Sequence, residues 1–136
     1  MNVKLTLGIV LVLFLTLIGC ESSTELDGKW DDNIKLSEKE VSVSSDATSV
    51  LITTDGTWWW LDGISWNGDW NYDLSESDVT EDNFLIEETE FTIERKNAKE
   101  IHITLTENTS ESERVLIIGL QAGNYFDSLK VVQTGN

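Results

Sequence analysis

The sequence contains no proline, one cysteine, one histidine, and nine lysine and arginine residues against 25 aspartate and glutamate residues. A single cysteine excludes a disulfide within the chain. The formal net charge of -16 leaves no basic surface for phosphate groups, so we expect no nucleic-acid partner. Proline on an edge strand prevents that strand from pairing with another chain, and this sequence has none. We expect the charges of Lys35, Glu38 and Lys130 to prevent such pairing instead.

Recognisable catalytic motifs are also missing. His102 lies in a threonine-rich stretch with no serine or cysteine motif beside it, which favours a solvated imidazole over a general base. The chain has neither zinc-type ligand spacing nor a glycine-rich phosphate loop. Its abundant carboxylates, such as Glu87, Glu88 and Glu90, are interpreted as a charged surface. We therefore predict a protein that is not an enzyme and that needs no cofactor.

The first twenty residues have the pattern of an export signal. A short basic start is followed by an apolar run from Leu5 to Ile18, which is short for a membrane span. The run ends in Leu17-Ile18-Gly19-Cys20, which looks like a bacterial lipobox with Cys20 as the lipidated residue. An ordinary secretory signal with an incidental cysteine is the alternative. The sequence thus predicts a lipoprotein signal peptide over residues 1–19 and a lipidated Cys20 with a polar tether over residues 20–30.

A lipid on Cys20 would hold the mature chain at a membrane by acyl chains, without a spanning helix of its own. We expect the protein in the cell envelope, in the outer membrane rather than the inner one. The remaining residues, 31–136, suit one domain in length.

Short alternating runs dominate that domain. Apolar residues alternate with polar ones around Ile34 and Leu36, Val41 and Val43, Val50 and Ile52, Phe91 and Ile93, and Ile101 to Leu105, while Arg114 to Leu120 and Tyr125 to Gln133 form longer runs. Turn residues separate these runs about every ten positions, and no long stretch has helical spacing. The pattern predicts an all-β, immunoglobulin-like antiparallel β-sandwich in a single domain.

The second half of the chain resembles a known family. Asn108, Arg114 at the start of an apolar strand, and the closing Leu129-Lys130-Val131-Val132-Gln133-Thr134-Gly135 are similar to the ending of BACON domains. These are immunoglobulin-like modules named for their association with Bacteroidetes carbohydrate-active proteins. Ser49 to Thr53 and Trp58 to Trp60 match earlier parts of the family's pattern, so that the resemblance covers most of residues 34–136. It implies a carbohydrate-binding module, although the region from Trp60 to Phe91 is longer and more aromatic than usual.

Five of the six tryptophans lie between residues 58 and 70. In a strand, Trp58 and Trp60 point to one side and Trp59 to the other, so the triplet cannot lie wholly in a core that has one wet face. We predict that Trp58 or Trp60 is a core residue and that Trp59, Trp66 and Trp70 are exposed.

The following segment has its own alternation. Trp66, Gly68, Trp70 and Tyr72 fall on one side, with Asn67, Asp69, Asn71 and Asp73 on the other. This pattern predicts a hairpin or flap whose aromatic side either packs against Trp59 or forms a platform for sugar rings. The candidate ligand-binding residues are Trp59, Trp66, Asn67, Asp69, Trp70 and Tyr72.

Calcium is a second possibility for the polar side of this segment. Asn67, Asp69, Asn71 and Asp73 place oxygen-bearing side chains at alternate positions, as calcium loops do. However, Tyr72 stands where an EF-hand needs glycine, and alternation along a solvated strand explains the spacing equally well. We therefore expect no metal at these residues.

Together these features predict a non-catalytic lipoprotein of the cell envelope that binds glycans or mucin-type glycoproteins. The alternative is a structural spacer or protein-interaction module of an envelope assembly, because exposed aromatic residues are also favoured at protein interfaces.

Overall fold

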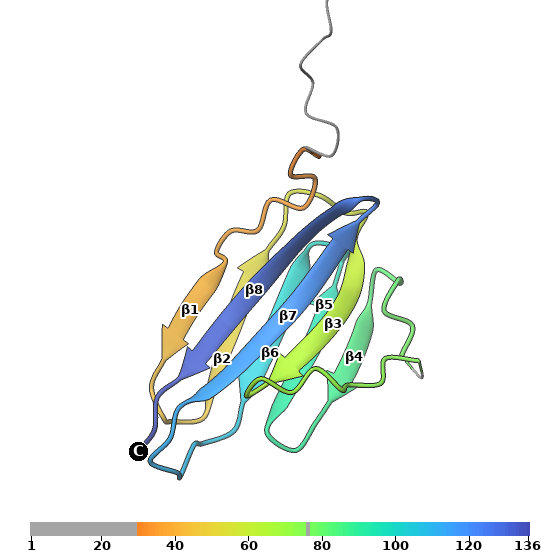
Figure 1. The fold of residues 1–136 in the computed structure, drawn as a ribbon. Helices are drawn as coiled ribbons and strands as arrows, with labels where there is room; N and C mark the ends of the chain where they lie inside the picture. The colour runs from red at the N-terminus through yellow and green to blue at the C-terminus, as the bar shows by residue number, and fades with distance from the viewer. Residues whose placement is uncertain (1–29, 76) are drawn as a thin grey trace, which may run out of the picture.

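The computed structural model describes residues 30–75 and 77–136. The predicted signal peptide, Cys20 and nearly all of the predicted tether lie outside these residues. The described part consists of eight β-strands (Figure 1): β1 (Glu40–Val43), β2 (Thr48–Thr53), β3 (Trp60–Trp66), β4 (Phe84–Glu87), β5 (Phe91–Lys96), β6 (Glu100–Leu105), β7 (Arg114–Ala122) and β8 (Tyr125–Gln133). None of the described residues belongs to a helix that could cross a membrane.

The strands form two four-stranded sheets that pack face to face (Figure 1). One sheet has the order β1-β8-β7-β3 and the other the order β2-β6-β5-β4. All pairs are antiparallel except β1 with β8, which run parallel from Glu40 opposite Lys130 to Val43 opposite Gln133. The predicted single-domain β-sandwich is confirmed.

Period-two alternation builds the core between the sheets. Leu116, Ile118, Leu120 and Ala122 of β7 point inward and meet Ile101, Ile103 and Leu105 of β6 within one buried cluster. The intervening residues of each strand face away from the core. The outward side chains of β7 are therefore Val115, Ile117, Gly119 and Gln121, and this outer face forms the site described below.

Three details differ from the sequence-based expectation. Ile34 and Leu36 do not form a strand, since only one bridge joins Leu36 to Thr54, although Ile34 is fully buried. Strand β4 was not among the predicted strands, and its residues Phe84 and Ile86 supply the inward positions. The parallel pairing of β1 departs from the expected antiparallel arrangement because β1 enters along the outer edge of β8 and is not joined to it by a hairpin.

A buried arginine fixes the chain segment that leads into β3. Arg95 of β5 is only 1% exposed, and its guanidinium donates five hydrogen bonds to four backbone carbonyl oxygens, those of Thr57, Trp59, Glu81 and Ala98. Burial lowers the pKa of Arg95, and the nearby negative charge of Asp82 opposes that effect. The guanidinium stays protonated because an arginine pKa has a wide margin above neutral pH.

Two buried amides join the loops at the opposite end of the sandwich. Asn108 donates to the carbonyl oxygens of Ser112 and Thr134, at 2.8 and 2.9 Å, and its own oxygen accepts from the Ser110 amide and hydroxyl. Gln133 donates to three further loop carbonyl oxygens, those of Ser45, Asp46 and Thr106. Both side chains are fully buried.

The C-terminal residues that carried the family resemblance therefore have structural roles at this end. Arg114 donates to the carbonyl oxygens of Thr106 and Glu107, and a Cβ atom on Gly135 would lie 2.2 Å from the Glu111 carbonyl oxygen. Only glycine fits at that approach. The motif closes the end of the sandwich and leaves the tryptophan region as the candidate site.

Candidate functional site

Trp59 belongs to the core, so the prediction that it is exposed is wrong. Its side chain is 2% exposed, lies 3.7 Å from the Arg95 guanidinium measured to the ring centroid, and donates from Nε1 to the Thr54 hydroxyl at 3.1 Å. The physical reason is the phase of the alternation, because Trp59 points to the same side as Leu61, which is also buried. Trp59 therefore cannot contact a ligand at the surface.

Trp58 and Trp60 take the opposite side, and neither is a buried core residue. Trp58 is 69% exposed and Trp60 is half-buried, with the two rings in an edge-to-face contact at 5.5 Å. Trp60 donates from Nε1 to Gln121 Oε1 at 3.2 Å, and Gln121 donates in turn to the Gly123 carbonyl oxygen. A Cβ atom on Gly123 would meet the Trp58 ring at 3.3 Å, so Trp58 rests against the β7–β8 turn.

Trp70 is exposed, as predicted, and lies on the same outer face. Gly63 of β3 pairs with Gly119 of β7 in the outward register, and a Cβ atom on Gly63 would contact the Trp70 ring at 3.6 Å. One side of the indole therefore rests on the glycine backbone, and 55% of Trp70 remains open to solvent. An alanine at Gly63 would make ordinary van der Waals contact with the ring, so there is little room for a side chain that extends further in this direction.

A tight turn returns the chain over β3 to position Trp70. Asn67 and Gly68 both have positive φ, 51° and 87°, and Trp66 bridges to Asp69 across them. Two central residues with positive φ are typical of a two-residue hairpin turn. The predicted hairpin is confirmed at this point, although the chain beyond Asp69 is not a strand.

Trp66 and Tyr72 do not share a side with Trp70, contrary to the prediction. Both are half-buried and pack on Phe91 of the other sheet, with ring centroids at 5.0 and 5.7 Å. The turn at Asn67 interrupts the strand alternation, so a period of two does not continue through the segment. Trp66 and Tyr72 therefore belong to the margin of the core.

Phe126 is a further exposed aromatic residue on the same outer face. Trp60 is opposite Gln121, and Gln121 is opposite Phe126, which places the three side chains in one row across β3, β7 and β8. Phe126 is 59% exposed. We define the outer aromatic face as Trp58, Trp60, Trp70, Phe126 and Gln121.

Sequence reasoning missed three aromatic members of this face, Trp58, Trp60 and Phe126. A usable signal was present in the neighbouring apolar residues. Leu61 fixes the inward side at the tryptophan triplet, and Leu129 and Val131 fix it in β8, which leaves Phe126 outward.

The polar candidate residues serve the hairpin itself. Asn67 Oδ1 accepts from the Val115 amide at 2.8 Å, Asp69 Oδ1 accepts from the Asn71 amide and side chain, and Asp73 Oδ1 accepts from the Ser75 amide. These bonds engage one oxygen of each side chain in local structure. Within residues 30–75 and 77–136, no three His, Cys, Asp or Glu side chains are grouped to hold a metal ion.

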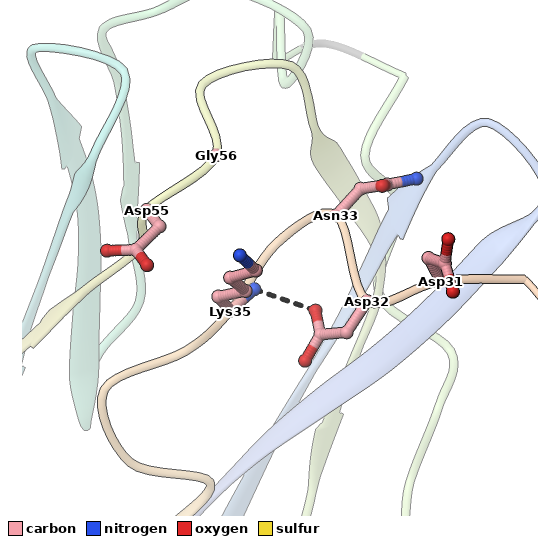
Figure 2. A pocket seen from close by; sticks show the side chains of 6 residues that line it. All are labelled: Asp31, Asp32, Asn33, Lys35, Asp55 and Gly56. Atoms are coloured by element: carbon pink, nitrogen blue, oxygen red, sulfur yellow. Dashed lines mark hydrogen bonds between the residues drawn. The ribbon is translucent and has the colours of Figure 1, made fainter.

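An open hollow of about 660 Å³ has no aromatic residue in its lining (Figure 2). It is lined by Asp31, Asp32, Asn33, Lys35, Asp55 and Gly56, with Asp31 and Asp55 on opposite sides. Burial alone would raise the pKa of the Asp32 carboxyl, but amide hydrogen bonds from Lys35 and Ile34 lower it below its ordinary value. Asp32 thus caps its own turn, and the hollow lacks the aromatic surface found on the outer sheet.

One hydroxyl on the outer side of β3 is buried without a partner. Ser65 is 0% exposed, and its Oγ is the single buried side-chain oxygen or nitrogen in the described residues that forms no hydrogen bond. We expect Ser65→Ala to leave the free energy of unfolding unchanged or to raise it by up to about 1 kcal/mol, because an unpaired buried hydroxyl costs desolvation energy. Urea unfolding of the two proteins measures the difference, and a loss of more than about 1 kcal/mol would contradict this assignment.

Comparison with known proteins identifies the fold. No protein-family model matches the sequence, and no curated protein has significant similarity to it. An NMR structure of a protein from Bacteroides thetaiotaomicron has a TM-score of 0.63 and 18% identity, covering 79% of this chain and 92% of the other. The chain also aligns with 19% of a Bacteroides ovatus GH5 xyloglucanase solved with a XXXG heptasaccharide, at 18% identity over 76% of this chain, but the TM-score of 0.46 is too low to support an argument.

The class defined by these observations is a single-domain β-sandwich with an aromatic outer face on one sheet. The particular chain shares its overall fold with the Bacteroides thetaiotaomicron protein. At 18% identity, this likeness concerns the fold alone.

Proposed function

We propose that this protein is a non-catalytic, BACON-like lipoprotein of the cell envelope that binds glycan chains through its outer aromatic face. The observation that carries the proposal is the exposure of Trp58, Trp70 and Phe126 on one side of a rigid sheet, at 69%, 55% and 59%. Pyranose rings offer polarised C–H groups to the electron-rich face of an aromatic ring, so exposed indoles on a fixed backbone form a suitable stacking surface.

Polar groups beside the aromatic rings can orient a bound sugar. Gln121 lies between Trp60 and Phe126 in the same row, and its amide is already held by Trp60 and the Gly123 carbonyl oxygen. The carboxylate of Asp62 is exposed next to Gly63 and accepts hydrogen bonds. A sugar on the rings would find hydrogen-bond partners at its edges.

The shape of the face favours a segment of a chain over a single terminal sugar. The Trp58–Trp60 pair lies near the β7–β8 turn, and Trp70 rests on Gly63, which is opposite Gly119. Gln121 and Gly119 are two residues apart on β7, a rise of about 7 Å. The two aromatic positions are therefore separate, and a ligand contacting both must extend along the sheet.

We expect Trp58→Ala and Trp70→Ala each to weaken glycan binding by about three- to tenfold, the range for loss of one aromatic contact. The measurement is the dissociation constant from isothermal titration calorimetry, in which plant and host glycans are titrated into the full-length chain in a detergent without sugar headgroups. The matched control is Leu51→Ala, because Leu51 is 54% exposed on β2 of the other sheet. Equal losses for all three variants would point to general damage and contradict the proposal.

Membrane anchorage through Cys20, in the outer membrane, is a separate part of the proposal, and it rests on the lipobox-like sequence. Metabolic labelling with a fatty-acid analogue tests it directly. We expect label on the native chain and none on Cys20→Ser. Label that persists on Cys20→Ser would contradict the assignment.

A further inference from the structure

The charges around the outer aromatic face restrict the ligands that it can take. We infer that this face selects uncharged glycan chains and rejects anionic ones, such as uronic-acid, sulfated or sialylated glycans. This inference rests on the proposed glycan-binding function and narrows its ligand class.

The first observation is the local negative charge. Asp62 is exposed between Leu61 and Gly63. A Cβ atom on Gly119 would lie 3.8 Å from the Asp62 Cβ, and a Cβ atom on the paired Gly63 would lie 3.6 Å from the Trp70 ring, so the Asp62 side chain starts from the same part of the outer face as Trp70. Asp69, next to Trp70 in sequence, is exposed as well. A ligand that contacts Trp70 therefore meets two acidic side chains.

The second observation is that the lysines near this face are neutralised. Lys130 points outward from β8, but its Nζ lies 3.0 Å from a Glu40 carboxylate oxygen. Lys39 pairs with Asp127, the neighbour of Phe126, at 2.7 Å, and with Asp32 at 3.9 Å. The hydrogen bond with Asp127 raises the pKa of Lys39, although burial acts in the opposite direction.

The remaining nearby arginine cannot serve an anion on this face. Arg114 pairs in register with Gln133, a buried inward position, and its guanidinium donates to the loop carbonyl oxygens of Thr106 and Glu107. Recognition of carboxylate or sulfate groups normally uses a free arginine guanidinium or lysine ammonium group. The described residues of the outer aromatic face present none.

The whole chain adds a repulsive background. With a formal charge of -16, its field opposes the approach of anionic polymers, most strongly at low ionic strength, where the screening length is long. This field does not weaken the binding of an uncharged sugar. Specificity then arises from a repulsive element as well as from the aromatic contacts.

The test compares oligosaccharides of equal length that differ only in charge, for example oligogalacturonate and its methyl ester. Binding to the full-length chain in a detergent without sugar headgroups is measured at low and at physiological salt. We expect the neutral form to bind at least about tenfold more tightly at low salt, with the difference narrowing as salt rises. Asp62→Lys is expected to reduce this ratio at least about threefold.

The matched control is Glu87→Lys, which makes the same change in net charge on β4 of the other sheet. The two variants are compared in physiological salt, where we expect Glu87→Lys to leave the ratio within about a factor of 1.5, because Glu87 lies on the other sheet and charges beyond the short screening length act weakly. If anionic glycans bind as tightly as neutral ones, or if Asp62→Lys and Glu87→Lys act alike, the charge selection is overturned while glycan binding stands. If no glycan of either kind binds, the proposed function itself fails.

Discussion

Replacing Arg95 with methionine is expected to lower the free energy of unfolding by about 3 to 5 kcal/mol, the range for removing one partner from a buried charged network. The substitution leaves the carbonyl oxygens of Thr57, Trp59, Glu81 and Ala98 without their donor. It also removes the cation that lies 3.7 Å from the centre of the Trp59 ring. Because small domains have roughly 5 to 15 kcal/mol of stability, this variant approaches the limit of folding.

The measurement is urea unfolding of residues 21–136, with tryptophan fluorescence as the signal that reports the unfolded fraction. Lys96→Met is the matched control, since Lys96 is the next residue, faces outward and forms only an exposed ion pair with Glu94. We expect it to change the free energy of unfolding by less than about 1 kcal/mol. A loss of under about 1 kcal/mol for Arg95→Met would show that the four carbonyl oxygens find other partners, and would contradict the role given to this residue.

Asn108→Asp is expected to be the second most damaging change, although the two side chains have nearly the same size and shape. The amide nitrogen of Asn108 donates to the Ser112 and Thr134 carbonyl oxygens, and a carboxylate would bring a negative charge against both. We expect a loss of about 2 to 4 kcal/mol at pH 7, the cost of burying polar groups without partners. The new carboxyl would have a pKa raised above its ordinary value, since burial and the facing carbonyl oxygens disfavour its charge.

The sign of the pH dependence follows from that raised pKa. When a carboxyl binds its proton more tightly in the folded state than in the unfolded state, the free energy of unfolding falls as the pH rises through the folded-state pKa. The penalty should therefore be greatest at neutral pH and should shrink on acidification relative to the unmodified protein. Asn124→Asp, in the exposed β7–β8 turn, is the control and should show neither the loss nor the pH trend. A penalty that is constant with pH would contradict this account of Asn108.

The fold was largely predictable from the sequence because period-two alternation marks the core-facing residues directly. Ile101, Ile103 and Leu105 alternate with polar neighbours, and all three are buried as expected. β4 was missed because its four residues lie between acidic stretches, and their burial depends on pairing with β5, which a single strand's sequence does not reveal.

The site was less predictable, because exposure depends on which phase of an alternation faces the core. All three residues of the Trp58–Trp60 triplet are equally apolar, so the triplet alone does not distinguish the two phases. The buried Leu61 fixes the phase, and Arg95 adds to it in the structure, since its guanidinium donates to the Trp59 carbonyl oxygen and packs on the Trp59 ring. The alternation of Phe91 and Ile93 does assign position 95 to the inward side of β5, but an arginine is rarely buried, so its identity hides that assignment.

The same arginine connects stability to the proposed function. By holding the carbonyl oxygens of Thr57 and Trp59, Arg95 fixes the backbone on both sides of Trp58. A stacking surface works best when its rings are held in place before the ligand arrives, because little conformational entropy is then lost on binding. The core contact thus positions an exposed ring on the opposite side of the strand.

The most direct test of the outer aromatic face is a two-dimensional NMR spectrum of the six indole N–H groups, recorded during titration with a neutral oligosaccharide. Each tryptophan gives its own signal, which is assigned by single Trp→Phe variants. The account predicts that the signals of Trp58, Trp60 and Trp70 shift as the glycan is added, while the buried Trp59 signal stays in place. Shifts confined to Trp30, or no shift in any tryptophan with every glycan tested, would contradict it.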